Sequence, residues 1–322
     1  MRNILCVTLI ALLGGCTSTS VTEKYQDKVI EFETGNVLIG SVSRLYMSNK
    51  CLLIADHKSV DKQIHIFNKN DFSYLTSIGN FGEGPEEITV MGCLAIDEAH
   101  HQLYVSDHAK QKIFSYDMDS VMVDSLYKPQ VKTAMNETLF PSEYQYINDT
   151  LSIAVLIKPT STSTFNQFLG RWNMNTGEMI PMKYTHPDIQ KKRITFAASE
   201  KAGIYVECYT RHDLMTICSL DGELLYNIYG PDWDGGNGNK LQSFGTVMIG
   251  NDKIFVSYCG EDYARDSFPT KILVFDLEGN YLKTLETGYK ISDCCYDSFN
   301  NRIILSLNDV VQFAYLDIDG II

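Results

Sequence analysis

Three histidines could do chemistry, because each adjoins an aspartate at the end of an apolar run. They stand in Asp56-His57, Asp107-His108 and Arg211-His212-Asp213. Imidazoles from separate segments could hold a metal ion such as Zn²⁺, or act as acid and base, if the fold brings them together. The alternative is that the aspartates cap turns and the histidines are exposed loop residues. The second interpretation is favoured, since only the first two of the three segments share the same Asp-His order.

A glycine-rich run, GNFGEGPEE, occupies residues 79–87. It is not a phosphate-binding loop, because no Lys-Ser/Thr pair and no helix follow it. The glycines predict a tight crossing between two structural units, which Pro85 would stiffen. The alternative is that Glu83, Glu86 and Glu87 edge a ligand or cation site, because clustered carboxylates suit a hard cation such as Ca²⁺.

Two long loops carry side chains suited to recognition. Trp233 lies among aspartates and glycines in residues 230–238, and Tyr263 and Arg265 lie in residues 259–270. Trp233 could stack on a sugar or a peptide, or fold back onto the protein. The candidate ligand-binding residues are Glu83, Glu86, Arg211, Trp233, Tyr263 and Arg265, and the candidate metal ligands are His57, His108 and His212. No catalytic residue is predicted, since the sequence lacks both Gly-x-Ser-x-Gly and His-Glu-x-x-His.

The elements that must position these residues recur about every fifty residues. The repeated segment reads LLIAD at 52–56 and LYVSD at 103–107, and looser copies begin at 151, 204, 254 and 303. A fixed period of this size, filled with short strands, predicts a propeller or an array. Each repeat holds four strand-like segments, including a fourth strand such as residues 74–78, 122–127, 224–229 or 281–286, and no segment after the N-terminal leader shows helical spacing.

The two chain ends predict how the ring closes. The last repeat stops after its third strand and a turn, whereas residues 28–32 form an unassigned alternating segment. We therefore expect an all-β, six-bladed β-propeller with four antiparallel strands per blade, its last blade closed by the N-terminal strand. The alternative is that residues 28–32 are only a linker.

The N-terminus resembles the leader of a bacterial lipoprotein. Arg2 precedes a short apolar run, and Leu13-Gly14-Gly15-Cys16 resembles a lipobox, which implies cleavage before Cys16 and its lipidation. An ordinary secretory signal is the alternative. The expected organisation is a signal peptide at 1–15, the lipidated cysteine and a flexible linker at 16–27, and the propeller at 28–322.

The net charge bears on the class of partner, and the cysteines bear on disulfides and metal sites. The net charge of −13 argues against nucleic-acid binding, which needs clustered Lys and Arg. Seven cysteines follow Cys16, none in CxxC spacing, so we expect mostly free buried thiols with room for one disulfide. No cofactor is expected, apart from the Ca²⁺ or Zn²⁺ that the carboxylates and histidines could bind.

Residues 79–87 are similar to the Gly-x-x-Gly-x-Gly-Pro-x-Glu segment of six-bladed, TolB-like propeller lipoproteins of Bacteroidetes. Residues 103–117 (LYVSDHAKQKIFSYD) resemble the NHL-type strand–loop–strand repeat. The resemblance implies fold and compartment. It also implies that blade-derived histidines could hold zinc, as they do in NHL-type lyases that cleave peptidyl hydroxyglycine.

Three functions remain open from the sequence. The favoured one is a lipid-anchored binding or scaffold module of the cell envelope, taking a protein, peptide or glycan on the face that carries the crossing loops. The alternatives are a metal-dependent hydrolase or lyase with its site in the axial funnel, and a structural part of an envelope assembly. Glu23 is the first acidic residue after Cys16, which favours the periplasmic side of the outer membrane over the cell surface.

Overall fold

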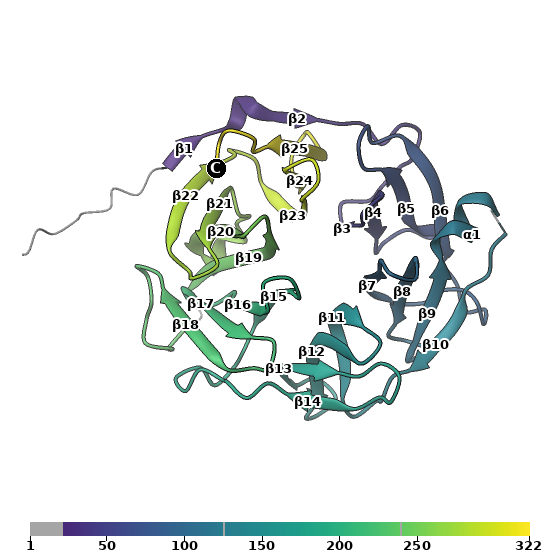
Figure 1. Cartoon of the computed structure of the whole chain (residues 1–322), viewed down its shortest axis with the longest axis horizontal. Helices are drawn as coiled ribbons and strands as arrows, with labels where there is room; N and C mark the ends of the chain where they lie inside the picture. The colour runs from purple at the N-terminus through teal and green to yellow at the C-terminus, as the bar shows by residue number, and fades with distance from the viewer. Residues whose placement is uncertain (1–21, 125, 239) are drawn as a thin grey trace, which may run out of the picture.

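The structure is a computed structural model that describes residues 22–124, 126–238 and 240–322. Six antiparallel sheets stand around a central axis like blades (Figure 1). This confirms the predicted six-bladed propeller. The expected signal peptide at 1–15, Cys16 and the first part of the linker lie outside the described residues.

The strands of each blade run outward from the axis in chain order. Blade 1 holds β3 (Ser43–Met47), β4 (Cys51–Asp56), β5 (Lys62–Asn68) and β6 (Tyr74–Asn80); blade 2 holds β7 (Met91–Asp97), β8 (Gln102–Asp107), β9 (Lys112–Asp117) and β10 (Gln130–Ala134); blade 3 holds β11 (Phe140–Asn148), β12 (Leu151–Pro159), β13 (Phe165–Trp172) and β14 (Met179–Pro181). Blade 4 holds β15 (Ile194–Ser199), β16 (Ile204–Tyr209), β17 (Leu214–Ser219) and β18 (Leu224–Tyr229); blade 5 holds β19 (Leu241–Gly250), β20 (Lys253–Asp262), β21 (Lys271–Asp276) and β22 (Tyr281–Glu286); blade 6 holds β23 (Ile291–Asp297), β24 (Arg302–Leu307) and β25 (Phe313–Asp317). Two 3-10 turns, η1 (Gln26–Lys28) and η2 (Tyr263–Arg265), complete the elements apart from those given below.

The N-terminal strand closes the ring, as predicted. β2 (Val29–Glu31) pairs antiparallel with β25 and becomes the outer strand of blade 6. The preceding strand, β1 (Thr22–Lys24), pairs in parallel with β22 and adds a fifth strand to blade 5. One short segment therefore pairs with the outer strands of two successive blades (Figure 1). The expectation of a flexible linker is thus wrong for residues 22–27, because strand pairing and the buried Tyr25 fix them on the ring.

The prediction of an outer strand at residues 122–127 is wrong. A short helix, α1 (Met118–Val123), follows β9, and the outer strand of blade 2 comes later, as β10. The Asp117 side chain accepts a hydrogen bond from the backbone N–H of Ser120 at 2.7 Å. This N-cap starts the helix and overrides the strand-like alternation of the sequence. The expectation that no helix follows the leader is corrected with it.

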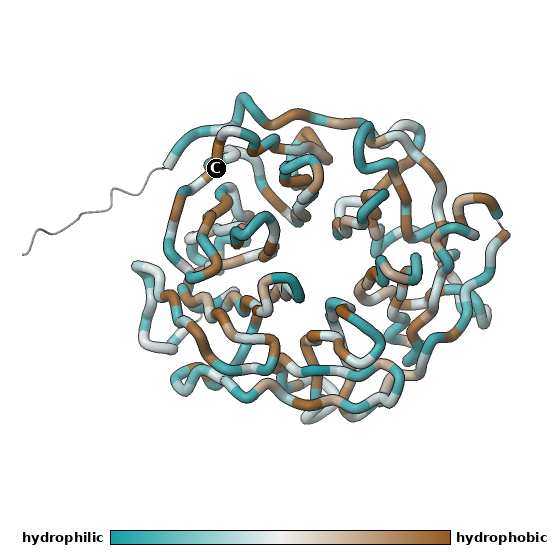
Figure 2. Tube along the Cα trace, viewed as in Figure 1, coloured by the Kyte–Doolittle hydropathy of each residue, from teal (hydrophilic) through white to brown (hydrophobic). Residues whose placement is uncertain are grey.

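The apolar cores lie between neighbouring blades. All six residues of β4, of β16 and of β24 are buried, because a second strand is covered by a blade on each side. Figure 2 shows hydrophobic residues distributed around the whole ring. All seven cysteines after Cys16 are buried and free. Within the described ranges, no helix is long and apolar enough to cross a membrane.

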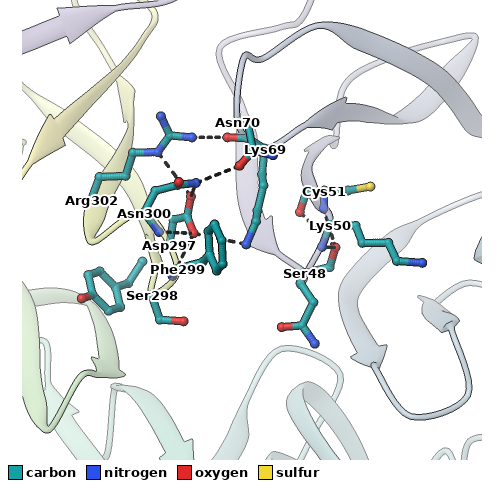
Figure 3. A network of polar contacts seen from close by, with 12 residues as sticks. Ser48, Lys50, Cys51, Lys69, Asn70, Asp297, Ser298, Phe299, Asn300 and Arg302 are labelled. Carbon is teal, nitrogen blue, oxygen red and sulfur yellow. Dashed lines mark hydrogen bonds and ion pairs between the residues drawn. The ribbon is translucent and has the colours of Figure 1, made fainter.

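The seam between blades 6 and 1 contains a buried ionic network (Figure 3). Asp297 lies 3.4 Å from the Lys69 ammonium and 3.3 Å from Arg302 Nε, and all three side chains are almost fully buried. Arg302 also donates to the Lys69 carbonyl and lies over the ring of Phe72, 4.5 Å from its centroid. Phe72 in turn stacks on Phe32, the residue after β2, at 3.9 Å. The buried ion pairs and the N-terminal strand that closes the ring therefore lie at the same seam.

Replacing Asp297 by Asn should lower the free energy of unfolding by about 3 kcal/mol, because two buried cations lose their counter-charge. Urea-induced unfolding measures the change. Asp317→Asn is the matched control, since Asp317 is exposed at the end of β25; an equal loss in both variants would contradict the network's role.

The same carboxylate predicts acid sensitivity. Burial alone would raise the pKa of Asp297, but hydrogen bonds from Asn300 and the charges of Lys69 and Arg302 outweigh it and hold that pKa below its usual range. A carboxyl whose pKa is depressed by folding stabilises fully above the unfolded pKa, about 3.9, and this contribution is lost as pH falls through the folded pKa. Stability should therefore fall in acid for the natural chain and less steeply for Asp297→Asn; parallel curves would contradict this.

Candidate functional site

A cavity of about 470 Å³ follows the propeller axis. Its walls are the innermost strands, which contribute polar side chains as well as apolar ones. The charged members are Arg44 on β3, Glu143 on β11, Asp293 on β23 and Glu98, the residue that follows β7. Sequence reasoning missed the first three, because it treated the inner strands as small and apolar. The signal that could have found them is a charge within the strand that precedes each repeated segment.

Arg44 and Glu143 form an ion pair inside this cavity. The Arg44 guanidinium donates to Glu143 Oε1 at 2.8 Å, joining blade 1 to blade 3 past the start of blade 2. Each side chain is 37% exposed. The pair therefore presents strong donors and an acceptor side by side to whatever enters the cavity.

Other polar contacts join the inner strands into what we call the inner belt. Asp293, which is buried, accepts hydrogen bonds from the backbone N–H of Leu45 at 2.8 Å and from the Thr246 hydroxyl at 2.7 Å, so it links blades 5, 6 and 1. Burial raises the pKa of Asp293. Gln145 exchanges two hydrogen bonds with the backbone of Ala198, linking blades 3 and 4. These contacts fix the walls against which Arg44 and Glu143 stand.

His57 and His108 approach the start of β7 from two neighbouring blades. His57 Nδ1 lies 3.2 Å from the carbonyl oxygen of Met91, and the His108 ring lies over Gly92, where a Cβ would come within 2.5 Å of Nε2. Within the described part of the chain, the Nε2 atoms of both histidines are buried and lack hydrogen-bond partners. Both side chains are half-buried, not exposed as the favoured interpretation expected.

Burial lowers the pKa of both histidines. The positive charge of Arg44 lowers the pKa of His57 further, whereas the carboxylates of Asp107 and Glu143 act against the lowering at His108. Both imidazoles are therefore neutral near pH 7. The Arg44–Glu143 pair acts on them in opposite directions, because Arg44 lowers the pKa of His57 and Glu143 raises that of His108.

The aspartates before these histidines cap their turns, as the sequence analysis expected. Asp56 accepts from the backbone N–H of Lys58 at 2.9 Å, and Asp107 accepts from that of Ala109 at 3.0 Å. Each also reaches the crossing loop that enters its blade, through Gly40 N–H at 2.7 Å and Thr89 N–H at 2.8 Å. These carboxylates therefore fasten the loops of what we call the crossing-loop face, the end of the ring that carries the crossings between blades.

His212 lies apart from the other two histidines, in blade 4. Its ring is 6.1 Å from those of both Tyr209 and Trp233, and its Nδ1 lies 3.7 Å from Asp234. Across residues 22–124, 126–238 and 240–322, no group of three or more His, Cys, Asp or Glu side chains is placed to hold a metal ion. The structure thus does not bring the three predicted metal ligands to one point.

Trp233 folds back onto the ring, which was one of its two expected placements. It is half-buried, with its ring 5.4 Å from His186 and 5.1 Å from Tyr229. Nearby, the Arg211 guanidinium lies over the Tyr263 ring, so the structure does bring these two predicted residues together. Arg265 is exposed and pairs with Glu261 at 3.0 Å.

The glycine-rich loop is held by one of its own side chains and by a lysine from the turn between β8 and β9. Glu87 accepts from the backbone N–H of Gly84 at 2.8 Å, and Lys110 donates to the Gly84 carbonyl at 2.7 Å. Glu86 is exposed and pairs with Lys128 at 2.8 Å, and Glu83 is exposed. The three carboxylates therefore diverge, which supports the structural interpretation of the loop.

Sequence comparison agrees with this architecture over the first half of the chain. Residues 17–167 match the model of a family, DUF5128, described as a 6-bladed β-propeller. The chain is a six-bladed β-propeller. No curated protein matches it in sequence. The more specific likeness to TolB-like and NHL-type propellers stays a prediction.

Solved structures resemble this propeller over most of its length. A DUF4221 family member from Bacteroides vulgatus has 11% identity and a TM-score of 0.59, covering 90% of this chain and 98% of that one. A Bacteroides fragilis protein described as exported has 14% identity and a TM-score of 0.56, covering 86% and 83%. A luciferin-regenerating enzyme has 8% identity and a TM-score of 0.58, covering 89% and 94%. At such low identity the likeness shows the fold alone.

Neutralising the two charges of the axial pair, one at a time, should shift the pKa values of the two neighbouring histidines in opposite directions. Arg44→Gln should raise the pKa of His57, because a lowering charge is removed, and Glu143→Gln should lower the pKa of His108, because a raising charge is removed. NMR titration of the histidine Cε1–H signals measures both, with His212 as the internal control. Shifts of the same sign, or none, would show that the pair does not govern these imidazoles.

Proposed function

We propose that this protein is a lipid-anchored module of the cell envelope that binds a peptide segment at its crossing-loop face and in the axial cavity. The exported Bacteroides fragilis protein of the same fold supports the envelope assignment. Lipidation of Cys16 and placement on the periplasmic side of the outer membrane are part of the proposal.

The observation that carries the proposal is the partly exposed Arg44–Glu143 pair in the axial cavity. Arg44 offers a fork of N–H donors, and Glu143 offers carboxylate acceptors beside it. A peptide backbone presents the complementary set, since each amide carries one acceptor and one donor. The inner belt fixes the strands that carry both side chains, and the side chains hold each other, so little ordering of the protein is needed on binding.

A peptide fits better than a glycan for two reasons. The Trp233 ring, the natural platform for a sugar, already contacts His186 and Tyr229. The axial cavity, at about 470 Å³, lies within the roughly 300–1,000 Å³ typical of ligand pockets and is lined by both polar and apolar side chains. Arg211 on Tyr263, together with Arg265, would extend the contact over blades 4 and 5.

The test is selection of peptides against the chain from residue 17 onward, which keeps every described strand, followed by fluorescence polarisation with a selected peptide. Arg44→Gln and Glu143→Gln should each weaken binding by about tenfold, which corresponds to one lost charge-assisted hydrogen bond. Trp233→Ala and Arg265→Ala should weaken it less.

Arg171→Gln is the matched control, because Arg171 forms a comparable surface pair with Asp221 at 3.0 Å, away from the axis. A peptide whose affinity is unchanged by Arg44→Gln and Glu143→Gln would exclude the axial pair. Glycan binding without any selected peptide would overturn the ligand class.

A further inference from the structure

A second hollow lies between blades 1 and 2, at the end of the ring opposite the crossing loops. Its volume is about 540 Å³. Apolar side chains from both blades form its floor and wall: Leu53, Leu75, Ile96, Leu103, Met118 and Met122. It shares Ile96 and Glu98 with the axial cavity, but the Arg44–Glu143 pair does not line it.

The hollow exists because large side chains that fill the preceding seam are replaced here. Between blades 6 and 1, the space is filled by Arg302, the first residue of β24, and by Lys69, the residue that follows β5 (Figure 3). The corresponding residues between blades 1 and 2 are Cys51, the first residue of β4, and Met118, which follows β9. A small thiol and an uncharged thioether leave room where a salt-bridged guanidinium and ammonium leave none.

The helix α1 adds a wall that the short turns of other blades do not provide. Met118 and Met122 are four residues apart, so they lie on the same side of the helix. Both line the hollow, and Met122 and Leu75 remain about 40% exposed at its mouth. Methionine side chains adapt to the shape of a bound molecule because they are unbranched and flexible.

The polar rim carries groups of both signs, and its carboxylates are engaged within the protein. His101 Nδ1 lies 2.7 Å from Asp119, and Glu98 accepts from the backbone N–H of Asn49 at 2.7 Å. Lys50 stands beside them on the same rim. The three carboxylates of the lining, Asp97, Glu98 and Asp119, each already accept a hydrogen bond from the protein. The apolar floor in turn penalises burial of a charge, so the hollow favours an uncharged ligand.

We propose that this hollow binds an uncharged, largely apolar small molecule. Its size lies in the range that encloses such ligands, and its apolar floor with a few hydrogen-bonding groups at the rim matches their usual sites. The proposal does not rest on the peptide site, because neither Arg44 nor Glu143 lines the hollow.

The test uses N-phenyl-1-naphthylamine, an uncharged apolar probe that fluoresces when shielded from water, with the chain from residue 17 onward. We expect saturable binding of one probe per chain. Leu75→Glu should weaken binding at least tenfold, since it places a carboxylate at the mouth. Leu225→Glu is the control, because Leu225 holds the same second position in the outer strand of blade 4 and is equally exposed.

Methionine-methyl NMR then locates the probe. The signals of Met118 and Met122, assigned with Met118→Leu and Met122→Leu, should shift on titration, and that of Met215, which is fully buried in blade 4, should not. Equal affinity in Leu75→Glu and Leu225→Glu, unmoved Met118 and Met122 signals, or no saturable binding would overturn the proposal. Loss of probe binding as the protein concentration rises would instead assign the hollow to contact between two copies.

Discussion

Every blade of this propeller needs a neighbour on both sides. The second strands are buried along their whole length, as in β4, β16 and β24, so a blade without partners would expose two apolar faces at once. This constraint makes closure the central event of the fold. β2 completes blade 6 at the rim, while Asp297, Lys69 and Arg302 join blades 6 and 1 in the interior. The two ends of the chain therefore meet inside blade 6, and the seam that follows is held by buried ion pairs as well as by apolar packing.

The sequence was sufficient for the architecture because the repeat and the missing last strand are both visible along the chain. It was not sufficient where a single capping hydrogen bond, or packing against a residue distant in the sequence, determines the local structure. Asp117 starts a helix through a single capping bond, which a strand pattern at residues 122–127 does not reveal. The burial of His57 and His108 depends on Met91 and Gly92, residues of β7 that only the ring brings beneath them. Such contacts cannot be read from spacing alone.

The charged residues of the axial cavity show a further property that the sequence does not reveal, which is their degree of burial. Asp293 and Arg44 both carry charges in inner strands, yet one is enclosed by backbone and hydroxyl donors and the other faces the cavity. The sequence around each residue does not show which of the two is enclosed and which faces the cavity. Alternation in a strand gives the side to which a side chain points, but what stands on that side is set by the neighbouring blade. The candidate site is therefore a property of blade packing, and not of any single repeat.

The double attachment of the N-terminal segment has a mechanical consequence. β1 holds blade 5 and β2 holds blade 6, with η1 between them. A pull on the chain upstream of Thr22 would load the three-residue pairing of β1 with β22 first, and would reach the closing strand only after that pairing had peeled away. β1 therefore takes up tension on the upstream chain before the closing strand does, and so protects the closure of the ring.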